Sequence, residues 1–450
     1  MVKSMTEGSP TKAIISFTLP ILIGNVFQQF YNMADTIIVG KTLGSKALAG
    51  VGSTGTISFL FFGLIAGMSV GFTVLTAQKF GAGDMDAMRK TVGCAAVLSA
   101  VITAVMTVVT VLLMNPLLNI MNTPDSFYSE AYNYIIVIAA GLFAQVMYNL
   151  LSSVLRALGD SRAPLYFLII SALLNIGLDF WFIAGIGMGT EGAAYATVIS
   201  QLVSSVLCFV YIVKKVPVLR LKKSDFRPDK SIMLNQLRLG CPMALQYSVT
   251  AVGAMILQSA LNPLGHIAVS GYTAANKIEQ VGTQAYVACG TTMATYCAQN
   301  TGAGEHYRIR RGFRSIMLLA AIYTVIISPL FFFFGKHLTG LFVSEDVFLI
   351  MPYADMYIKY MTVFLIPLAV VNIFRNGLQG VGLALMPFLG GVAELLARWA
   401  VAALGAAHSS YRIICLASPL AWIAAAVLLL AVYYFKIVRR PQYKKPKNEG

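Results

Sequence analysis

"AQKFGAGDMDAMRK" at residues 77–90 returns in altered form as "AQNTGAGEHYRIRR" at residues 298–311. The two copies share Ala-Gln, Gly-Ala-Gly, an acidic residue and a downstream arginine at one constant offset. The Leu-Gly pair at 43–44 matches another at 264–265 at the same offset, and Pro20 matches Pro242 with one extra residue. Chance seldom keeps so many glycines and prolines in register. The sequence therefore predicts a fold built from two similar halves that follow one another along the chain.

The composition predicts that this duplicated unit lies in a membrane. The chain has 450 residues, of which 58% are hydrophobic and only 11% charged, and its mean hydropathy is +0.74. A soluble domain is roughly 25% charged. Apolar runs of about 20 or more residues recur along the chain, and each can cross a hydrocarbon core as a helix. Outer-membrane barrels show short alternating segments instead. The predicted fold is an all-α polytopic membrane protein.

Twelve transmembrane helices are predicted, six in each copy of the repeat. Their ranges are 12–39, 47–78, 91–114, 129–155, 163–186, 191–213, 238–262, 267–298, 312–335, 352–378, 384–406 and 411–437.

The charge distribution predicts the topology. The net charge is +15, which a nucleic-acid-binding protein would also show, but most of the 33 lysines and arginines fall in connections on one side. Arg375, close to the end of its span, is counted with these inner connections. Positive residues gather on the cytoplasmic side of membrane proteins. Both termini are therefore predicted to be cytoplasmic, and no nucleic acid is expected as a partner. The outer connections hold Lys41, Lys46, Lys336, Lys359 and Arg412.

Because six is an even number, both halves cross the membrane in the same direction, as in one arrangement of repeats found in secondary transporters. The predicted domains are an N-terminal six-helix lobe at 1–213, a basic cytoplasmic linker at 214–237, a C-terminal six-helix lobe at 238–437 and a basic cytoplasmic tail at 438–450. Two pseudo-symmetric lobes of this kind enclose a central cleft.

Polar residues form stripes on three predicted helices of the first half. A spacing of three or four residues places side chains on one face of a helix. Polar groups inside a membrane are costly, so such stripes are expected to face the interior of the bundle. The stripes are Asn25, Gln28, Asn32 and Asp35 on the first helix, Gln145, Tyr148 or Asn149, and Ser152 on the fourth, and Ser171, Asn175 and Asp179 on the fifth.

Asp35 and Asp179 are predicted to form a coupling site. Both aspartates fall in the outer half of the same lobe, counted at about 1.5 Å of rise per residue from the cytoplasmic end. Two carboxylates close together cannot both stay ionised cheaply, so one takes a proton or a cation lies between them. Asp35, Asn175 and Asp179 are the candidate ligands for Na⁺, and Asn32 and Tyr148 complete the candidate site. Alternatively, Asp35 extends from its helix end to the outer interface near Lys41.

The second half has different ionisable residues. By the repeat offset, Ile256 stands in the place of Asp35 and Ala402 in the place of Asp179. Glu394 and Arg398, one helical turn apart, either neutralise each other or place Glu394 against a cationic substrate. Lys277 faces either the cavity or the cytoplasmic vestibule, and the role of Glu279 stays open. The candidate residues of the substrate cleft are Gln28, Gln145, Asn149, Glu394, Arg398 and Lys277.

The motifs argue against cofactors and against an enzyme. Neither Gly-Ala-Gly copy has the GxxxxGK[ST] pattern of a phosphate loop, so no use of ATP is expected. The six cysteines and four histidines lack the spacing of a zinc site or a disulfide framework. "GAGD" at 81–84 matches a pattern of intramembrane aspartyl proteases. It is repeated as "GAGE" beside basic residues, so tight turns that end two helices are predicted instead.

The chain resembles the multidrug and toxin extrusion (MATE) family, in its bacterial form. The stretches that carry the resemblance are "SFTLPILIGNVFQQFYNMADTIIVG" (16–40), "AQKFGAGD" (77–84), "AQNTGAGE" (298–305), "LRALGDSRAPL" (155–165), "LLNIGLDFWFI" (173–183) and "TEGAAYATVISQ" (190–201). The resemblance implies twelve helices in two lobes around a V-shaped cleft, and a cation or proton site at Asp35, Asn175 and Asp179. It maps a fourth-helix tyrosine onto Tyr148. Some members carry an acidic residue on helix seven, but "PMALQYSVTAVGAMIL" (242–257) has none.

The resemblance implies export of organic cations and xenobiotics in exchange for Na⁺ or H⁺. Separately, the protein is expected to be a monomer in the cell (inner or plasma) membrane, in contact with membrane lipids. The sequence leaves the coupling ion and the physiological substrate open. The main alternative is a flippase for lipid-linked or polysaccharide precursors, which needs a cationic cleft for pyrophosphate and usually has additional helices. An ion channel is a further alternative. It would differ from an exchanger because its transport would lack saturable exchange.

Overall fold

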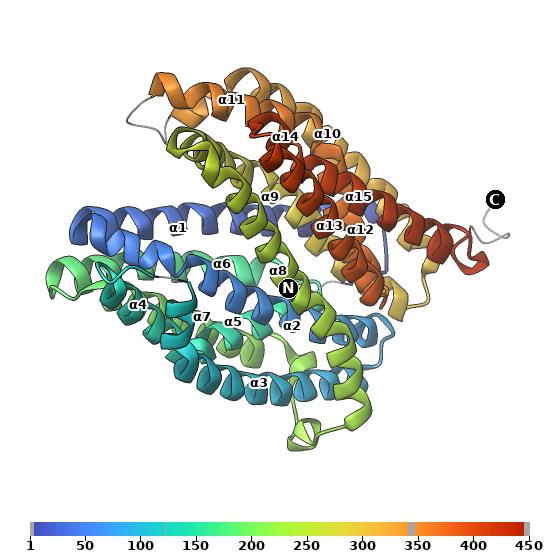
Figure 1. Ribbon diagram of the computed structural model, residues 1–450. Helices are drawn as coiled ribbons and strands as arrows, with labels where there is room; N and C mark the ends of the chain where they lie inside the picture. The colour runs from blue at the N-terminus through green and yellow to red at the C-terminus, as the bar shows by residue number, and fades with distance from the viewer. Residues whose placement is uncertain (1–3, 122, 341–346, 445–450) are drawn as a thin grey trace. The chain divides into compact units, whose positions relative to one another are not determined.

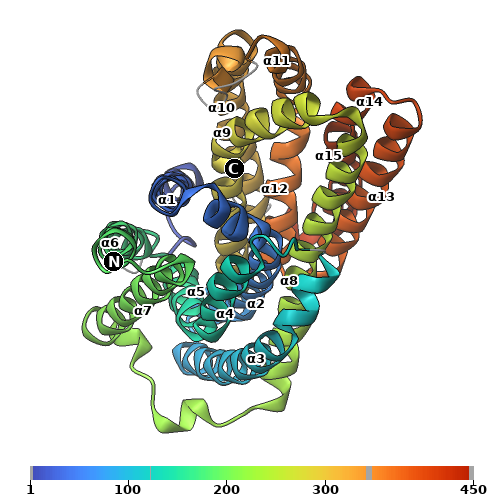
Figure 2. The same cartoon turned by 60° about the vertical axis from the view of Figure 1, so that its left-hand side comes forward.

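The structure is a computed structural model that describes residues 4–121, 123–340 and 347–444 (Figure 1). Throughout these ranges the chain forms helices joined by short connections and contains no strand, as both views of the ribbon show (Figures 1 and 2). The predicted all-α class is confirmed. Part of the predicted basic tail, residues 445–450, lies outside the described residues.

The described chain divides into two compact units. The first unit holds Ile23–Ala244, and the second holds Met5–Leu22 together with residues 245–444. The domain boundaries predicted from the sequence stay predictions.

The first half of the chain contributes α1 Pro10–Ser53, α2 Gly55–Gly81, α3 Met85–Ile120, α4 Tyr128–Ala140, α5 Leu142–Ala157, α6 Arg162–Asp179, the π-helix η1 Phe180–Gly185, α7 Thr190–Lys215 and the 3₁₀ turns η2 Pro217–Leu219 and η3 Lys223–Phe226. The second half contributes α8 Lys230–Leu261, η4 Asn262–Leu264, α9 His266–Gly302, α10 His306–Gly340, α11 Val347–Val363, α12 Leu365–Gly380, α13 Leu385–Ala407, α14 Tyr411–Cys415, α15 Ala417–Tyr433, the π-helix η5 Tyr434–Val438 and η6 Pro441–Tyr443.

Most of these helices have the length and composition of membrane spans. Among the described residues, nine helices are long and apolar enough to cross a membrane, and two bent pairs bring the number to eleven. The predicted span at 267–298 is the helix α9, which is not among them. Its C-terminal half is buried inside the second unit. A helix covered by protein on most sides needs fewer apolar residues than one that faces lipid.

The duplication is visible in the backbone. α4 and α5 meet at a bend of 50°, and α11 and α12 meet at a bend of 56° at the corresponding place of the second half. Glycines with positive φ recur in matching pairs, which are Gly44 and Gly265, Gly83 and Gly304, and Gly159 and Gly382. These conformations are accessible to glycine and costly for other residues. The internal repeat predicted from the sequence is therefore confirmed.

The two Gly-Ala-Gly stretches end helices, as predicted. α2 ends at Gly81 and α9 ends at Gly302, and a glycine with positive φ follows each end two residues later. Asp84 directly precedes α3, and its carboxylate accepts a hydrogen bond from the backbone N–H of Ala87 at 3.0 Å. The side chain of Asp84 is thus a helix cap.

Both helices that open a half change unit next to a proline. α1 passes from the second unit into the first between Leu22 and Ile23, just after Pro20. α8 passes from the first unit into the second between Ala244 and Leu245, just after Pro242. A proline inside a helix removes one backbone hydrogen bond and weakens the helix at that point.

The N-terminal segment is anchored to the second unit by hydrogen bonds. The backbone N–H of Met5 donates to Oε1 of Gln299 at 2.8 Å. The guanidinium of Arg308 donates to the backbone carbonyls of Met5, Glu7 and Gly8 at 2.8–3.2 Å. It also donates to Oδ1 of Asn300 at 3.0 Å. One arginine therefore fixes the segment that leads into α1.

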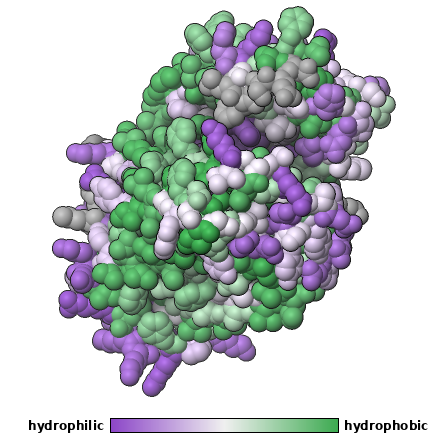
Figure 3. All heavy atoms as spheres, turned by 90° about the vertical axis from the view of Figure 1, so that its left-hand side faces the viewer, coloured by the Kyte–Doolittle hydropathy of each residue, from purple (hydrophilic) through white to green (hydrophobic). Residues whose placement is uncertain are grey.

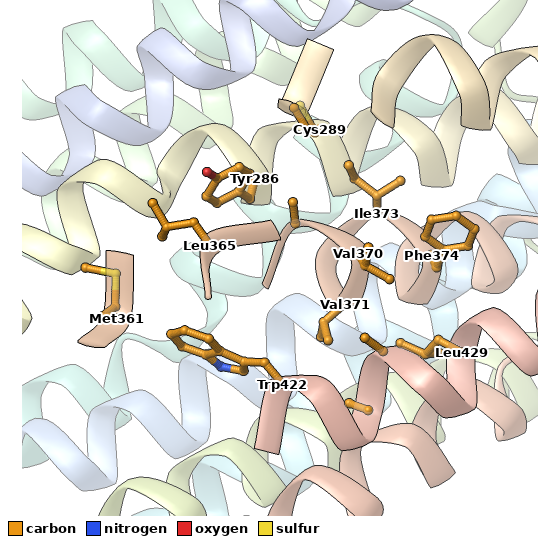
Figure 4. Packing of buried hydrophobic residues seen from close by; sticks show 14 of the residues in the cluster. Tyr286, Cys289, Met361, Leu365, Val370, Val371, Ile373, Phe374, Trp422 and Leu429 are labelled. Carbon is orange, nitrogen blue, oxygen red and sulfur yellow. The ribbon is translucent and has the colours of Figure 1, made fainter. Parts of the chain in front are cut away.

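The second unit has one large hydrophobic core, built mainly around α9 and α12. Tyr286 and Cys289 from α9, Val370 and Phe374 from α12, and Trp422 from α15 pack together in its interior (Figure 4). The first unit has smaller buried clusters, including one of α2, α3, α5 and α7 side chains. Hydrophobic side chains also cover wide areas of the surface between hydrophilic patches (Figure 3). Such surface suits contact with lipid chains.

Close backbone packing in the first unit predicts a sensitive position. A Cβ atom at Gly71 of α2 would lie 2.3 Å from Cα of Gly240 in α8, and backbone cannot move aside as a side chain can. Overpacking costs about 1–3 kcal/mol or more. We expect Gly71→Ala to lower the melting temperature of the purified protein clearly. The matched control is Gly52→Ala, where a Cβ meets nothing within 4 Å. An equal melting temperature for both variants would contradict this packing.

Candidate functional site

The carboxyl groups of Asp35 and Asp179 come together in the interior of the first unit. Asp35 lies on α1 in the part that belongs to this unit, and Asp179 is the last residue of α6. The two carboxyl groups lie close enough for each to influence the other electrostatically. Asn175, one turn before Asp179 on α6, is fully buried, as is Asp179. The helical spacing predicted this shared face of α6.

The oxygens of this cluster lack partners. Oδ1 of Asp35, Oδ1 of Asn175 and both carboxylate oxygens of Asp179 are buried and accept no hydrogen bond from the described residues. No lysine or arginine among the described residues forms an ion pair with either aspartate. Buried polar groups are normally satisfied, and buried charges are normally paired. The cluster therefore has the chemistry of a site for a small cation or a proton.

Three side chains that carry hydroxyl groups lie near the cluster. Tyr31 on α1 and Tyr134 on α4 both lie close enough to interact electrostatically with Asp35 and Asp179. Nδ2 of Asn175 donates to Oγ1 of Thr197 on α7 at 3.4 Å, which leaves Oδ1 of the amide free for another partner. These three residues were not predicted from the sequence. Only Tyr31 carried a signal, since it precedes Asp35 by one turn on the same face.

A π-helix follows the pair directly. η1 begins at Phe180, immediately after Asp179, where α6 ends. π-helical turns inside α-helices are frequent at functional sites, because the extra residue disturbs the regular bonding. The helix geometry thus changes next to the unpartnered carboxylate.

Two residues predicted for the coupling site make no hydrogen bond to either aspartate within the described part of the chain. Asn32 is exposed on α1. The hydroxyl of Tyr148 donates to the backbone carbonyl of Pro164 at 3.2 Å. Pro164 lies near the start of α6 and Asp179 at its end, so roughly 20 Å of helix separates them at about 1.5 Å per residue. The structure does not bring Tyr148 to the two aspartates.

The predicted cleft residues of the first unit are half-buried. Nδ2 of Asn149 donates to the backbone carbonyl of Gln145, one turn earlier on α5, at 2.8 Å. Gln28 lies half-buried on α1, two turns before Asp35. None of the three makes a described side-chain hydrogen bond to the aspartate pair. Their role in binding substrate stays a prediction.

In the second unit, Glu394 bridges two arginines. Its carboxylate accepts from Nη2 of Arg375 at 2.6 Å and from Nη2 of Arg398 at 2.8 Å. All three side chains are buried, and Nε of each arginine has no partner among the described residues. The prediction that Arg375 lies in an inner connection is wrong, because it sits inside α12 facing α13. A Cβ at Gly253 would meet Nη1 of Arg398 at 2.5 Å, so this glycine leaves room for the guanidinium.

Glu279 forms part of the same region of the second unit. Its carboxylate accepts hydrogen bonds from the hydroxyl of Tyr357 and from Nδ2 of Asn276, the latter at 3.3 Å. It also interacts electrostatically with Arg398. Lys277, two residues earlier on α9, is exposed. Glu279 therefore has partners on α9, α11 and α13.

Among the described residues, no group of three or more histidine, cysteine, aspartate or glutamate side chains has a metal-binding arrangement. The oxygen set of the first unit instead combines two carboxylates with one amide. Hard cations prefer oxygen ligands of this kind.

Two units with repeated backbone features, apolar helices of membrane length and a buried carboxylate pair define a multi-pass membrane protein with internal duplication. A family model described as MatE matches residues 20–181 and again residues 242–404. The chain belongs to this family, whose members are transporters rather than enzymes. The double match agrees with the repeat found in the sequence.

Named relatives and solved structures are similar over nearly the whole chain. The probable multidrug resistance protein YpnP of Bacillus subtilis is 29% identical over 395 residues, which covers 88% of this chain and 87% of that protein. The probable multidrug resistance protein NorM of Thermotoga maritima is 27% identical over 383 residues, or 84% and 82% of the two chains. A MOP superfamily transporter from Pyrococcus furiosus superposes with a TM-score of 0.92 at 24% identity, covering 98% of each chain. This last likeness shows the fold.

Proposed function

We propose that the protein is a secondary active transporter that exports organic cations in exchange for Na⁺ or H⁺. The observation that carries the proposal is the set of buried oxygens on Asp35, Asn175 and Asp179 that have no partner among the described residues. Two carboxylates in such surroundings need a counter-charge. A transported cation or proton supplies it only while bound, so the site changes its charge with each cycle.

Exchange follows from this change by linkage. An ion shifts a conformational equilibrium only by its different affinity for the two states. If the ion binds best in the state that releases substrate, the substrate must weaken ion binding by the same factor. In the proposed cycle the ion enters between α1 and α6 and neutralises the aspartate pair. The pair then favours the conformation that releases the exported cation.

The names of the relatives support a drug as the exported compound, since two of them are described as multidrug resistance proteins. The flippase alternative is not favoured. It requires free cationic groups for a pyrophosphate, whereas the buried Arg375 and Arg398 both donate to Glu394. We further propose that the protein acts as a monomer without ATP in the cell membrane, with cytoplasmic termini.

Reconstituted transport tests the proposal. Liposomes that contain the purified protein are loaded with ethidium. A Na⁺ gradient and a pH gradient are then imposed in separate experiments. We expect ethidium to move against its own gradient under one of the two conditions, and that condition names the ion. The matched control is liposomes without protein under the same gradients. Ethidium movement that ignores both gradients, or none at all, would overturn the exchange model.

A further inference from the structure

The surface where α10 begins and the last helix ends carries a dense group of basic side chains. We call this group the basic collar, and all its members belong to the second unit. Its members are Arg310, Arg311, Arg314, Lys436, Arg439, Arg440 and Lys444.

Aromatic packing joins the two segments of the collar. The ring of Phe313 on α10 lies 4.8 Å from that of Tyr433 at the end of α15. His306 lies 4.9 Å from Tyr443 in η6. The guanidinium groups of Arg310 and Arg314 lie close enough to the Tyr433 hydroxyl to interact with it electrostatically. The basic residues of the two segments thus share one patch, although more than 120 positions separate them in the sequence.

The positive charge of the collar is not balanced by described acidic residues. Neither residues 306–340 nor residues 411–444 contain an aspartate or glutamate. No collar residue forms an ion pair with another described residue. The acidic residues near the patch are the exposed Glu305, just before α10, and the exposed Glu7, whose backbone carbonyl accepts from Arg308. The collar therefore attracts negative charge from outside the protein.

The collar continues an exposed apolar surface of its helices. Arg311 and Arg314 are exposed and share a helical face with Leu318 and Val325, which are 63% and 73% exposed. On the last helix, Tyr434 and Phe435 are 54% and 56% exposed and directly precede Lys436. Aromatic side chains followed by basic ones mark the level of lipid headgroups. Apolar, aromatic and cationic surface follow one another in the order of an acyl chain, its glycerol region and an acidic headgroup.

We propose that the basic collar binds the phosphate-bearing headgroup of an anionic phospholipid, with the acyl chains lying along the exposed faces of α10 and α15. Basic residues that only orient a helix in the membrane can lie on any side of it. Here Arg311 and Arg314 stand on the same exposed face as the apolar residues Leu318 and Val325, where a headgroup can reach them. Clusters of lysine and arginine next to a membrane helix attract anionic lipids in this way.

A thermal-shift titration of the full-length protein in detergent tests the proposal without any transport measurement. The protein is titrated with mixed micelles of phosphatidylglycerol or of phosphatidylcholine, and the concentration that gives half of the maximal stabilisation is compared. We expect the wild type to prefer phosphatidylglycerol. The combined substitution Arg311→Gln, Arg314→Gln and Arg439→Gln should reduce that preference at least about tenfold.

The matched control removes the same charge elsewhere. Lys223→Gln, Arg227→Gln and Lys230→Gln change three exposed basic residues of the linker region, and this variant should keep the wild-type preference. Equal loss in both variants, or no preference in the wild type, would overturn the proposal. So would full competition by soluble glycerol phosphate, because a free phosphate would then suffice. Should the collar variant fail to fold, the wild type at ~0.1 M and ~1 M salt decides, since strong screening should abolish a preference based on headgroup charge.

Discussion

Asp179→Asn is expected to reduce ion-driven export of ethidium by about a hundredfold, near the upper end of typical coupling between two sites. The substitution keeps the size of the side chain but removes one of the two ionisable carboxyl groups that lie close together on α1 and α6. The remaining aspartate then has less need of a bound cation or proton. The ion gradient then shifts the conformational equilibrium much less, while the substrate site stays intact.

The same change should leave the protein folded. Neither carboxylate oxygen of Asp179 accepts a hydrogen bond from a described residue, so no partner is lost. We expect an unchanged or higher melting temperature, because two adjacent buried carboxylates repel each other. Asp125→Asn, an exposed aspartate before α4, is the matched control and should export normally. Normal export by Asp179→Asn would remove this residue from the coupling mechanism.

A double-mutant cycle distinguishes one ion site shared by the two aspartates from two independent sites. If Asp35 and Asp179 bind one ion together, Asp35→Asn combined with Asp179→Asn should export no worse than either single variant. Independent roles would instead give losses that multiply. The initial rate of ethidium movement under the effective gradient is the measurement.

Glu394→Gln should destabilise the second unit strongly. The substitution leaves Arg375 and Arg398 buried without the carboxylate that both contact. Removing one partner of a buried ion pair costs about 3–5 kcal/mol, because the other charge remains in apolar surroundings. We expect a melting temperature lower by about 5 °C or more in detergent.

Arg375→Met is the control for that prediction. It keeps the contact of Glu394 with Arg398, so one negative and one positive group remain together. Its melting temperature should fall less than that of Glu394→Gln, because the remaining Glu394 and Arg398 still neutralise each other and no buried charge is left unpaired. A larger loss for Arg375→Met than for Glu394→Gln would show that the number of guanidinium groups, and not their neutralisation, stabilises this region.

The architecture could be predicted from the sequence because its signals are local or repeated. Hydrophobic length marks spans, and glycines such as Gly44 and Gly265 mark the same bend twice. Asn175 and Asp179 could be paired because helical spacing puts them on one face. Spacing alone could not show that Tyr134 and Thr197, from two other helices, would meet them. Arg375 was misplaced because a charge near a predicted helix end resembles a loop charge, and only packing reveals its partner on the next helix.

The exchange of half-helices between the units bears on how the chain acquires its structure during synthesis. Ile23–Ala244 is one continuous stretch, so the first unit is complete once residue 244 has been made. Domains generally fold in the order in which they are synthesised. The second unit, however, needs Met5–Leu22, which leaves the ribosome before every other part of it. The N-terminal part of α1 is therefore synthesised first but cannot complete its packing until more than two hundred later residues have been made. Only then can Gln299 and Arg308 form hydrogen bonds with the segment that precedes it.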